Sequence, residues 1–116
     1  MEKPSIESEV CESVRQGDVL LVRVPARLLS TLKLEKRIQP ESGRLILARG
    51  EATGHHHSVP ARHARMYETA MGTILQVVKA CQLEHQEHGV IDLMTATYLS
   101  IRQQEYTPRG LRNVQD

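Results

Sequence analysis

The sequence contains neither Phe nor Trp, and its only aromatic residues are Tyr67, Tyr98 and Tyr106. Leu, Ile, Val and Met must therefore fill the interior of the fold. At 116 residues the chain is long enough for one hydrophobic core and too short for two. Because so small a core leaves a modest surplus of burial over chain entropy, a bound ion or a homodimer would add useful stability.

The chain also lacks a strong net charge, a long hydrophobic run and a cysteine framework. Its formal net charge is +1, so no overall field attracts nucleic acid or an anionic membrane. No stretch approaches the roughly 18 apolar residues of a membrane-spanning helix, and the first residues lack the apolar segment of a signal peptide. Cys11 and Cys81 lie far apart, which favours free thiols over a disulfide. We therefore expect a cytoplasmic protein without a membrane segment.

Short strand-forming runs follow turn residues along the chain. Residues 19–24 and 44–49 are rich in Leu, Ile and Val, and they come directly after the turn-forming pairs or clusters Gly17-Asp18 and 40–43. Residues 98–104 alternate between apolar and polar side chains, as a half-buried strand does. Several short strands separated by turns predict an all-β fold, a small barrel or sandwich of antiparallel strands.

The stretch 61–82 fits either a helix or a β-hairpin, because its apolar residues satisfy both periods. We favour the hairpin, with arms at 65–68 and 73–80 around the turn 69–72. A glycine such as Gly72 costs about 1 kcal/mol relative to Ala in a helix interior. Residues 26–38 follow neither period strictly and are assigned to a connector, in which a helical turn is possible.

Three parts of the chain are expected from these patterns. Residues 1–15 are polar and acidic and form a loose N-terminal arm. Residues 16–108 form the β-rich domain. Residues 109–116 form a polar C-terminal tail.

Histidine is the one chemically informative residue type here, and five of the six histidines fall into two groups. The first group is His55, His56 and His57, and the second is His85 and His88. If the first group continues a strand, His55 and His57 point to the same face because strand side chains alternate. His85 and His88 are three residues apart, which lets both rings converge from a turn.

We therefore predict a metal centre with His55, His57, His85 and His88 as ligands. Neutral imidazole suits transition metals, and zinc is the ion that we expect most. The same histidines could instead be hydrogen-bonded loop residues, or they could bind a phosphate or acidic ligand when protonated. His63 stands apart from both groups and is expected to face solvent.

An open coordination position on such an ion would allow metal-assisted hydrolysis. Glu87, or Glu84 as the alternative, is then the expected general base. A closed site with four histidines would instead be structural or sensory, and the spacing does not decide between the two. Whether the protein is an enzyme therefore stays open.

The rival hypothesis is a non-enzymatic interaction module, such as a phage or mobile-element accessory protein. Its weak support is a C-terminal group of basic and aromatic residues that could bind single-stranded nucleic acid. These residues are Arg102, Arg109, Arg112, Tyr98 and Tyr106. An ordinary solvated strand and tail explain them more simply.

Four segments resemble a family of small bacterial and phage β-domains. They are residues 16–19, the Gly-His-His-His end of 50–57, the His-Gln-Glu-His-Gly run at 85–89, and residues 104–108. The resemblance covers the chain from about Gln16 to Pro108 and implies that the two histidine groups belong to one site, but it implies no activity. The histidine spacing is also similar to that of cupin barrels, although cupins place a Glu shortly after the first pair and Glu68 is too distant here.

Overall fold

The chain forms an all-β fold, as the sequence predicts. A computed structural model describes residues 12–50, 54–107 and 110–113. The strands are β1 (Ser13–Gln16), β2 (Val19–Arg23), β3 (Lys36–Arg37), β4 (Arg44–Arg49), β5 (His56–Pro60), β6 (Ala64–Thr69), β7 (Gly72–Val77), β8 (Cys81–Leu83), β9 (Ile91–Leu93), β10 (Ala96–Arg102), β11 (Gln104–Thr107) and β12 (Gly110–Asn113). Two short helical segments, α2 (Ala26–Leu29) and η1 (Ala61–His63), connect strands.

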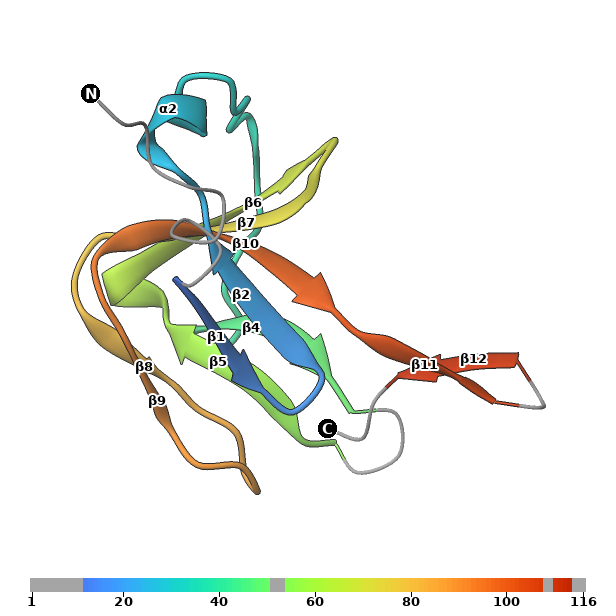
Figure 1. The fold of residues 1–116 in the computed structure, drawn as a ribbon. Coiled ribbons are helices and arrows are strands. Elements are labelled where there is room, and N and C mark those ends of the chain that lie inside the picture. The colour runs from blue at the N-terminus through green and yellow to red at the C-terminus, as the bar shows by residue number, and fades with distance from the viewer. Residues whose placement is uncertain (1–11, 51–53, 108–109, 114–116) are drawn as a thin grey trace.

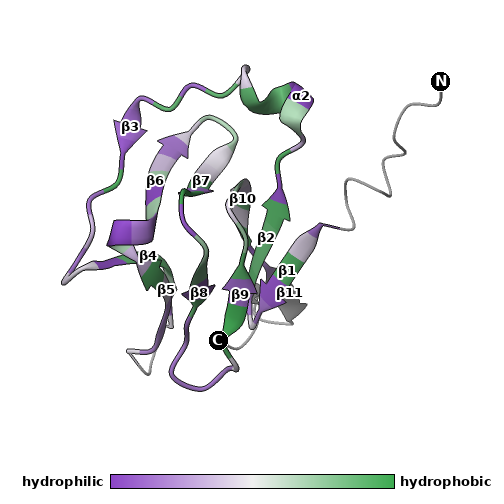
Figure 2. Ribbon diagram, turned by 90° about the vertical axis from the view of Figure 1, so that its left-hand side faces the viewer, coloured by the Kyte–Doolittle hydropathy of each residue, from purple (hydrophilic) through white to green (hydrophobic). Residues whose placement is uncertain are grey.

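The strands pack as a sandwich. One layer is a six-stranded antiparallel sheet in the order β1-β2-β10-β7-β6-β3. The hairpins β4–β5 and β8–β9 lie across it as the second layer, and a bridge between Ser58 and Glu84 joins these two hairpins (Figures 1 and 2). The β11–β12 hairpin extends away from both layers (Figure 1). The sheets do not close into a barrel.

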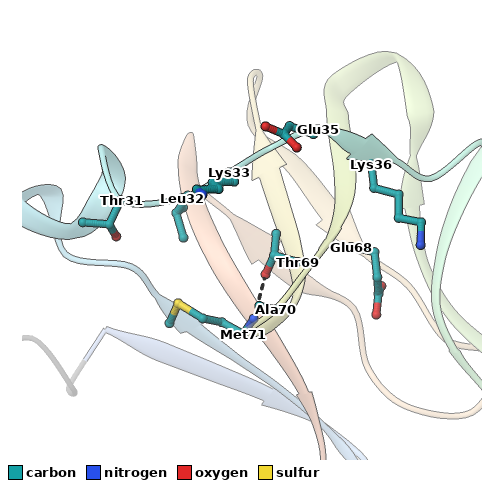
Figure 3. Close-up of a pocket in the computed structure, with 9 residues that line it drawn as sticks. All are labelled: Thr31, Leu32, Lys33, Glu35, Lys36, Glu68, Thr69, Ala70 and Met71. Atoms are coloured by element: carbon teal, nitrogen blue, oxygen red, sulfur yellow. Dashed lines mark hydrogen bonds between the residues drawn. The ribbon is translucent and has the colours of Figure 1, made fainter.

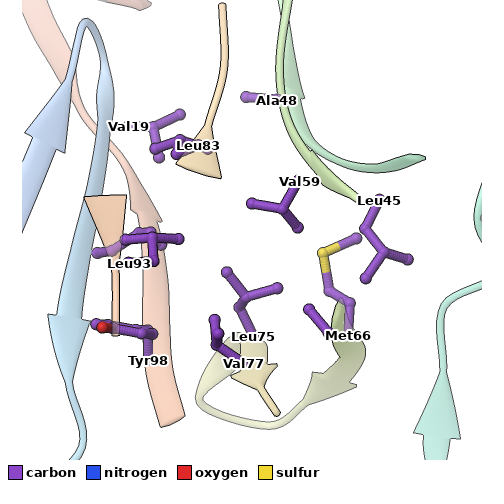
Figure 4. Close-up of a cluster of buried hydrophobic side chains, with 12 residues drawn as sticks. Val19, Leu45, Ala48, Val59, Met66, Leu75, Val77, Leu83, Leu93 and Tyr98 are labelled. Carbon is purple, nitrogen blue, oxygen red and sulfur yellow. The ribbon is translucent and has the colours of Figure 1, made fainter. Parts of the chain in front are cut away.

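Aliphatic side chains from the two layers meet in one core, because strand residues alternate between the two faces of a sheet. Leu21 and Leu75 of the large sheet and Val59, Leu83 and Leu93 of the hairpins are all at most 2% exposed. Figure 4 shows Val59, Leu75, Leu83 and Leu93 pointing to a common interior. The core is therefore built without Phe or Trp, as the composition requires.

Most of the predicted elements are confirmed. The run 44–49 is β4, and the run 19–24 is β2 except for its last residue. The ambiguous stretch is the hairpin β6–β7, in which Thr69 pairs with Gly72. The alternating stretch at 98–104 lies mostly in β10, which begins two residues earlier and ends at Arg102.

The predicted arm and tail are shorter than expected. Ser13 to Arg15 belong to β1, because they pair with residues 20–22 of β2. Residues 110–113 form β12 and pair with β11. Each strand has one strongly apolar residue, Val14 or Leu111, so hydrophobic patterning did not reveal them. Residues 1–11 of the predicted arm and residues 109 and 114–116 of the predicted tail lie outside the described part of the chain.

The connector at 26–38 contains two short elements, a helical turn that its sequence allows and a strand that its pattern did not predict. Residues 26–29 form α2, and Lys36 and Arg37 pair with Tyr67 and Glu68 at the sheet edge. No helix within the described ranges is long and apolar enough to cross a membrane.

Candidate metal centre

The two histidine groups come together at one end of the sandwich. His57 lies on β5, and His85 and His88 lie in the loop that joins β8 to β9. The turn between β1 and β2 approaches the same place, since its Gly17 lies against the rings of His57 and His88. Figure 2 shows the hydrophilic β8–β9 loop at that end of the molecule. Residues far apart in sequence thus form one polar site beside the core.

Four rings form a connected cluster, which we call the histidine cluster: His55, His57, His85 and His88. The ring centroids of His57 and His85 are 4.3 Å apart, and those of His85 and His88 are 4.5 Å apart. His55 and His85 are separated by 5.5 Å, and His57 and His88 by 5.9 Å with nearly parallel rings. The four residues predicted as ligands are therefore the four that the fold brings together.

His57 is the most buried member of the cluster, with a side chain that is 0% exposed. Its Nδ1 lies 2.9 Å from Oε1 of Gln16, and its Nε2 lies 3.1 Å from Oδ1 of Asp18. Burial, together with the nearby charge of His85, lowers the pKa of His57 to about 4, although Asp18 acts in the opposite direction. His57 is therefore neutral at physiological pH in the metal-free protein.

Asp18 is a fully buried carboxylate with two partners. Its second oxygen accepts a hydrogen bond from Nε of Arg102 at 2.6 Å. Arg102 also donates to the carbonyl oxygen of Arg49. Since an unpaired buried charge is costly, the guanidinium of Arg102 compensates the carboxylate and fixes its orientation.

Gln16 holds the loop that carries the second histidine group. Its side chain is nearly buried, and its Nε2 donates to the carbonyl oxygens of Leu83 at 3.1 Å and Gly89 at 2.8 Å. These two carbonyls stand at either end of the segment that contains His85 and His88. Gln16 therefore links the β8–β9 loop to the ring of His57.

The ring of His85 is oriented by its own loop. Its Nδ1 accepts hydrogen bonds from the backbone N–H groups of Glu87 at 3.0 Å and His88 at 3.3 Å. A neutral imidazole that accepts at Nδ1 carries its proton on Nε2. In this arrangement His85 therefore has no lone pair free for a metal ion.

Glu87, the expected general base, lies at the rim of the cluster. Its side chain is more than half exposed, and its Oε1 lies 3.5 Å from Nδ1 of His55. His56 turns to a neighbouring cavity of about 260 Å³, which is lined by Arg44, His56, Ser58, Glu84, His85 and Gln86. His63 is half-buried in η1, away from the cluster, rather than facing solvent as predicted.

Gly17 is the one position of the β1–β2 turn where a side chain would collide with the cluster. Its φ is +58°, and a Cβ atom there would lie 2.6 Å from Nε2 of His88 and 3.2 Å from Cε1 of His57. Glycine therefore serves both the turn and the close approach of the ring.

We expect Gly17→Ala to lower the free energy of unfolding by about 2 kcal/mol, of which about 1 kcal/mol comes from the left-handed backbone. Gly43→Ala is the matched control, because Gly43 has a φ of +77° and nothing lies within 4 Å of its missing Cβ. Urea unfolding of both variants measures the difference. Equal losses would mean that the His88 contact contributes nothing.

Among the described residues, no three His, Cys, Asp or Glu side chains are already arranged to hold a metal ion. The hydrogen bonds above explain this result, because Nδ1 of His85 faces backbone amides and Nε2 of His57 faces a carboxylate. A metal ion would have to replace or adjust some of these contacts.

The sequence did not single out Gln16, Asp18 or Arg102 as site residues. Asp18 was interpreted as turn chemistry and Gln16 as part of a resemblance, although a Gln and an Asp flanking a glycine directly before an apolar strand are a usable signal. The expected nucleic-acid surface also loses two members. Tyr98 is only 6% exposed and donates to the carbonyl oxygen of Met94, while Arg102 pairs with Asp18.

A larger cavity of about 570 Å³ lies elsewhere, between the 31–36 segment and the tip of the β6–β7 hairpin (Figure 3). Its charged lining residues are Lys33, Glu35, Lys36 and Glu68, so charges of both signs balance. Thr69 accepts a hydrogen bond from the backbone of Met71 at its base. None of the residues predicted as metal ligands or as general base lines this cavity.

Comparisons with known proteins give one match. Residues 15–103 match the family described as Domain of unknown function (DUF8820). No curated protein and no solved structure matches the chain. The matched region contains every member of the histidine cluster together with Gln16, Asp18 and Arg102.

Proposed function

The chain belongs to the DUF8820 family, and from the geometry of its histidine cluster we propose that it binds a divalent transition-metal ion, zinc being the best fit. Imidazole nitrogens bind Zn²⁺ well, and a small domain gains stability from any ion that binds its folded form. The candidate ligands are the cluster residues His55, His57, His85 and His88, of which His85 would first have to release the backbone amides that its Nδ1 accepts from.

The spacing of the rings is the observation that supports this proposal. A ring centroid lies about 3.2 Å from an ion that its nitrogen binds at about 2.1 Å, so two rings at a tetrahedral angle have centroids about 5 Å apart. The four centroid distances in the cluster run from 4.3 to 5.9 Å. Rings that share one ion have the same spacing, although the nitrogens must turn to converge on it.

Zinc analysis of protein prepared without a histidine tag tests the proposal. We expect about one zinc ion per chain, and we expect His57→Ala and His88→Ala each to weaken zinc binding at least tenfold, because each removes a buried nitrogen donor. His63→Ala is the control, since His63 lies in η1 outside the cluster. Wild-type protein that binds no zinc above the level of the His57→Ala variant would refute the proposal.

Hydrolytic activity is a second part of the proposal, and it depends on Glu87. An exposed carboxylate beside a metal-bound water could act as a general base, and Glu87 is exposed and near His55. Loss of esterase or phosphatase turnover in Glu87→Gln, with zinc content unchanged, would support this role. An interaction module of bacterial or phage origin remains the alternative function, and a zinc-free wild-type protein would favour it.

A further inference from the structure

The hydrogen bonds of Gln16 determine which nitrogen of His57 carries a proton. The amide nitrogen of Gln16 donates to two backbone carbonyl oxygens, which can only accept. The amide oxygen is therefore the atom that faces His57, at 2.9 Å from Nδ1. Nδ1 must donate in this contact, so the proton of the neutral ring lies on Nδ1 and the lone pair lies on Nε2.

That lone pair faces another acceptor. Nε2 of His57 lies 3.1 Å from Oδ1 of Asp18, and both side chains are 0% exposed. A carboxylate oxygen has no proton to give, so in the metal-free protein two acceptors face each other, and a metal ion between them would satisfy both. Two atoms that bind one ion at about 2.1 Å each, at angles between 90° and the tetrahedral value, stand roughly 3.0 to 3.4 Å apart. The observed separation lies in that range.

A third donor atom lies beside them. Nε2 of His88 is buried and has no hydrogen-bond partner among the described residues. Its ring lies over Gly17 and stacks on the ring of His57. This nitrogen lies where a side chain of Gly17 would be, beside the ring of His57, and Gly17 is next in the chain to Asp18.

We propose that the β1–β2 turn supplies a ligand of the metal centre, so that the ion is held by His57 Nε2, His88 Nε2 and the carboxylate of Asp18. This inference rests on the proposed metal binding and changes its ligand set. Arg102 bonds the other oxygen of Asp18, and Gln16 bonds the ring of His57. In metal sites, residues that hydrogen-bond to the ligands commonly orient them in this way. His85 packs against both rings with its Nδ1 on backbone amides and stays outside the coordination shell.

Two imidazoles and one carboxylate leave coordination positions for water or a small ligand. Catalytic zinc sites have three protein ligands, whereas structural sites have four, and sites of two His and one carboxylate also suit Fe(II). The site is therefore of the open type, which the spacing of the histidines alone could not decide.

X-ray absorption of the zinc-loaded wild-type protein tests the ligand set without any mutation. Multiple scattering from the rings counts the bound imidazoles, and we expect two. A count of three or four would overturn the assignment of Asp18 while leaving metal binding intact. A wild-type protein that takes up no zinc would overturn both proposals.

Asp18→Asn provides the independent test, because it keeps the volume of the side chain and removes its charge. We expect zinc binding at least tenfold weaker than in wild type, as measured by competition with a chromophoric chelator. Asp92→Asn is the control, since Asp92 lies exposed on β9 and bonds Gln82. Zinc affinity of Asp18→Asn equal to wild type would overturn the inference. If this variant does not fold, the imidazole count decides.

Discussion

Lowering the pH from 7.5 to 4.5 should cost the metal-free protein about 3 kcal/mol of its free energy of unfolding through His57 alone. The unfolded chain has a histidine pKa near 6.5, and the folded chain holds that of His57 at about 4. Between pH 6.5 and 4, His57 is therefore mostly protonated in the unfolded state and mostly neutral in the folded state. A difference of about 2.5 between the two pKa values corresponds to about 3 kcal/mol.

The sign of this effect follows from a depressed pKa. The contribution of His57 is complete above pH 6.5 and is lost as the pH falls from 6.5 to 4. The groups that face the ring are Gln16, Asp18, His85 and His88, and of these Asp18 alone favours the protonated form. Protonation would place a second positive charge against Asp18, which already pairs with Arg102.

Urea unfolding in the presence of a chelator, repeated across this pH range, measures the loss. His63→Gln serves as a control that should keep the full pH dependence, and an NMR titration of the His57 ring protons reports its pKa directly. Stability that does not change between pH 7.5 and 5, or a His57 pKa above 6.5, would contradict the prediction.

The strands that sequence patterns predicted share one property, which is that they line the core. Residues 44–49 and the β6–β7 hairpin place Leu45, Met66 and Leu75 in the interior, so their periodicity records burial. By contrast, β3 consists of two exposed residues, Lys36 and Arg37, and its backbone pairing with β6 defines it. Pattern analysis detects side chains that face a core, and it misses strands that are made by backbone hydrogen bonds alone.

The candidate site divides in the same way. Histidine clustering identified four rings, and the fold brings those four together. Asp18 and Arg102 lie 84 positions apart, so their pairing follows from the placement of β2 beside β10 and leaves no local pattern. Tyr98 was instead assigned a role that it does not have, because its aromatic ring suggested a nucleic-acid surface but packs in the core. Local sequence thus identified the residues with unusual chemistry and could not identify the partners that orient them.

Gln16→Ala should lower the free energy of unfolding by about 3 to 5 kcal/mol, because it leaves two buried groups and one partly buried group without their partner. These groups are the carbonyl oxygens of Leu83 and Gly89 and Nδ1–H of His57. Gln76→Ala makes the same chemical change on the half-buried outer face of β7 and should cost less than about 1 kcal/mol.

Gln16→Glu separates the two roles of this side chain. A carboxylate can still accept from His57 but cannot donate to the two carbonyls, so we expect a loss of stability close to that of Gln16→Ala. Hydrogen exchange should show the β8–β9 loop opening more often in both variants, since the link at its two ends is gone. If Gln16→Glu is instead as stable as wild type, the loop does not depend on Gln16, and its only role is to orient the ring of His57.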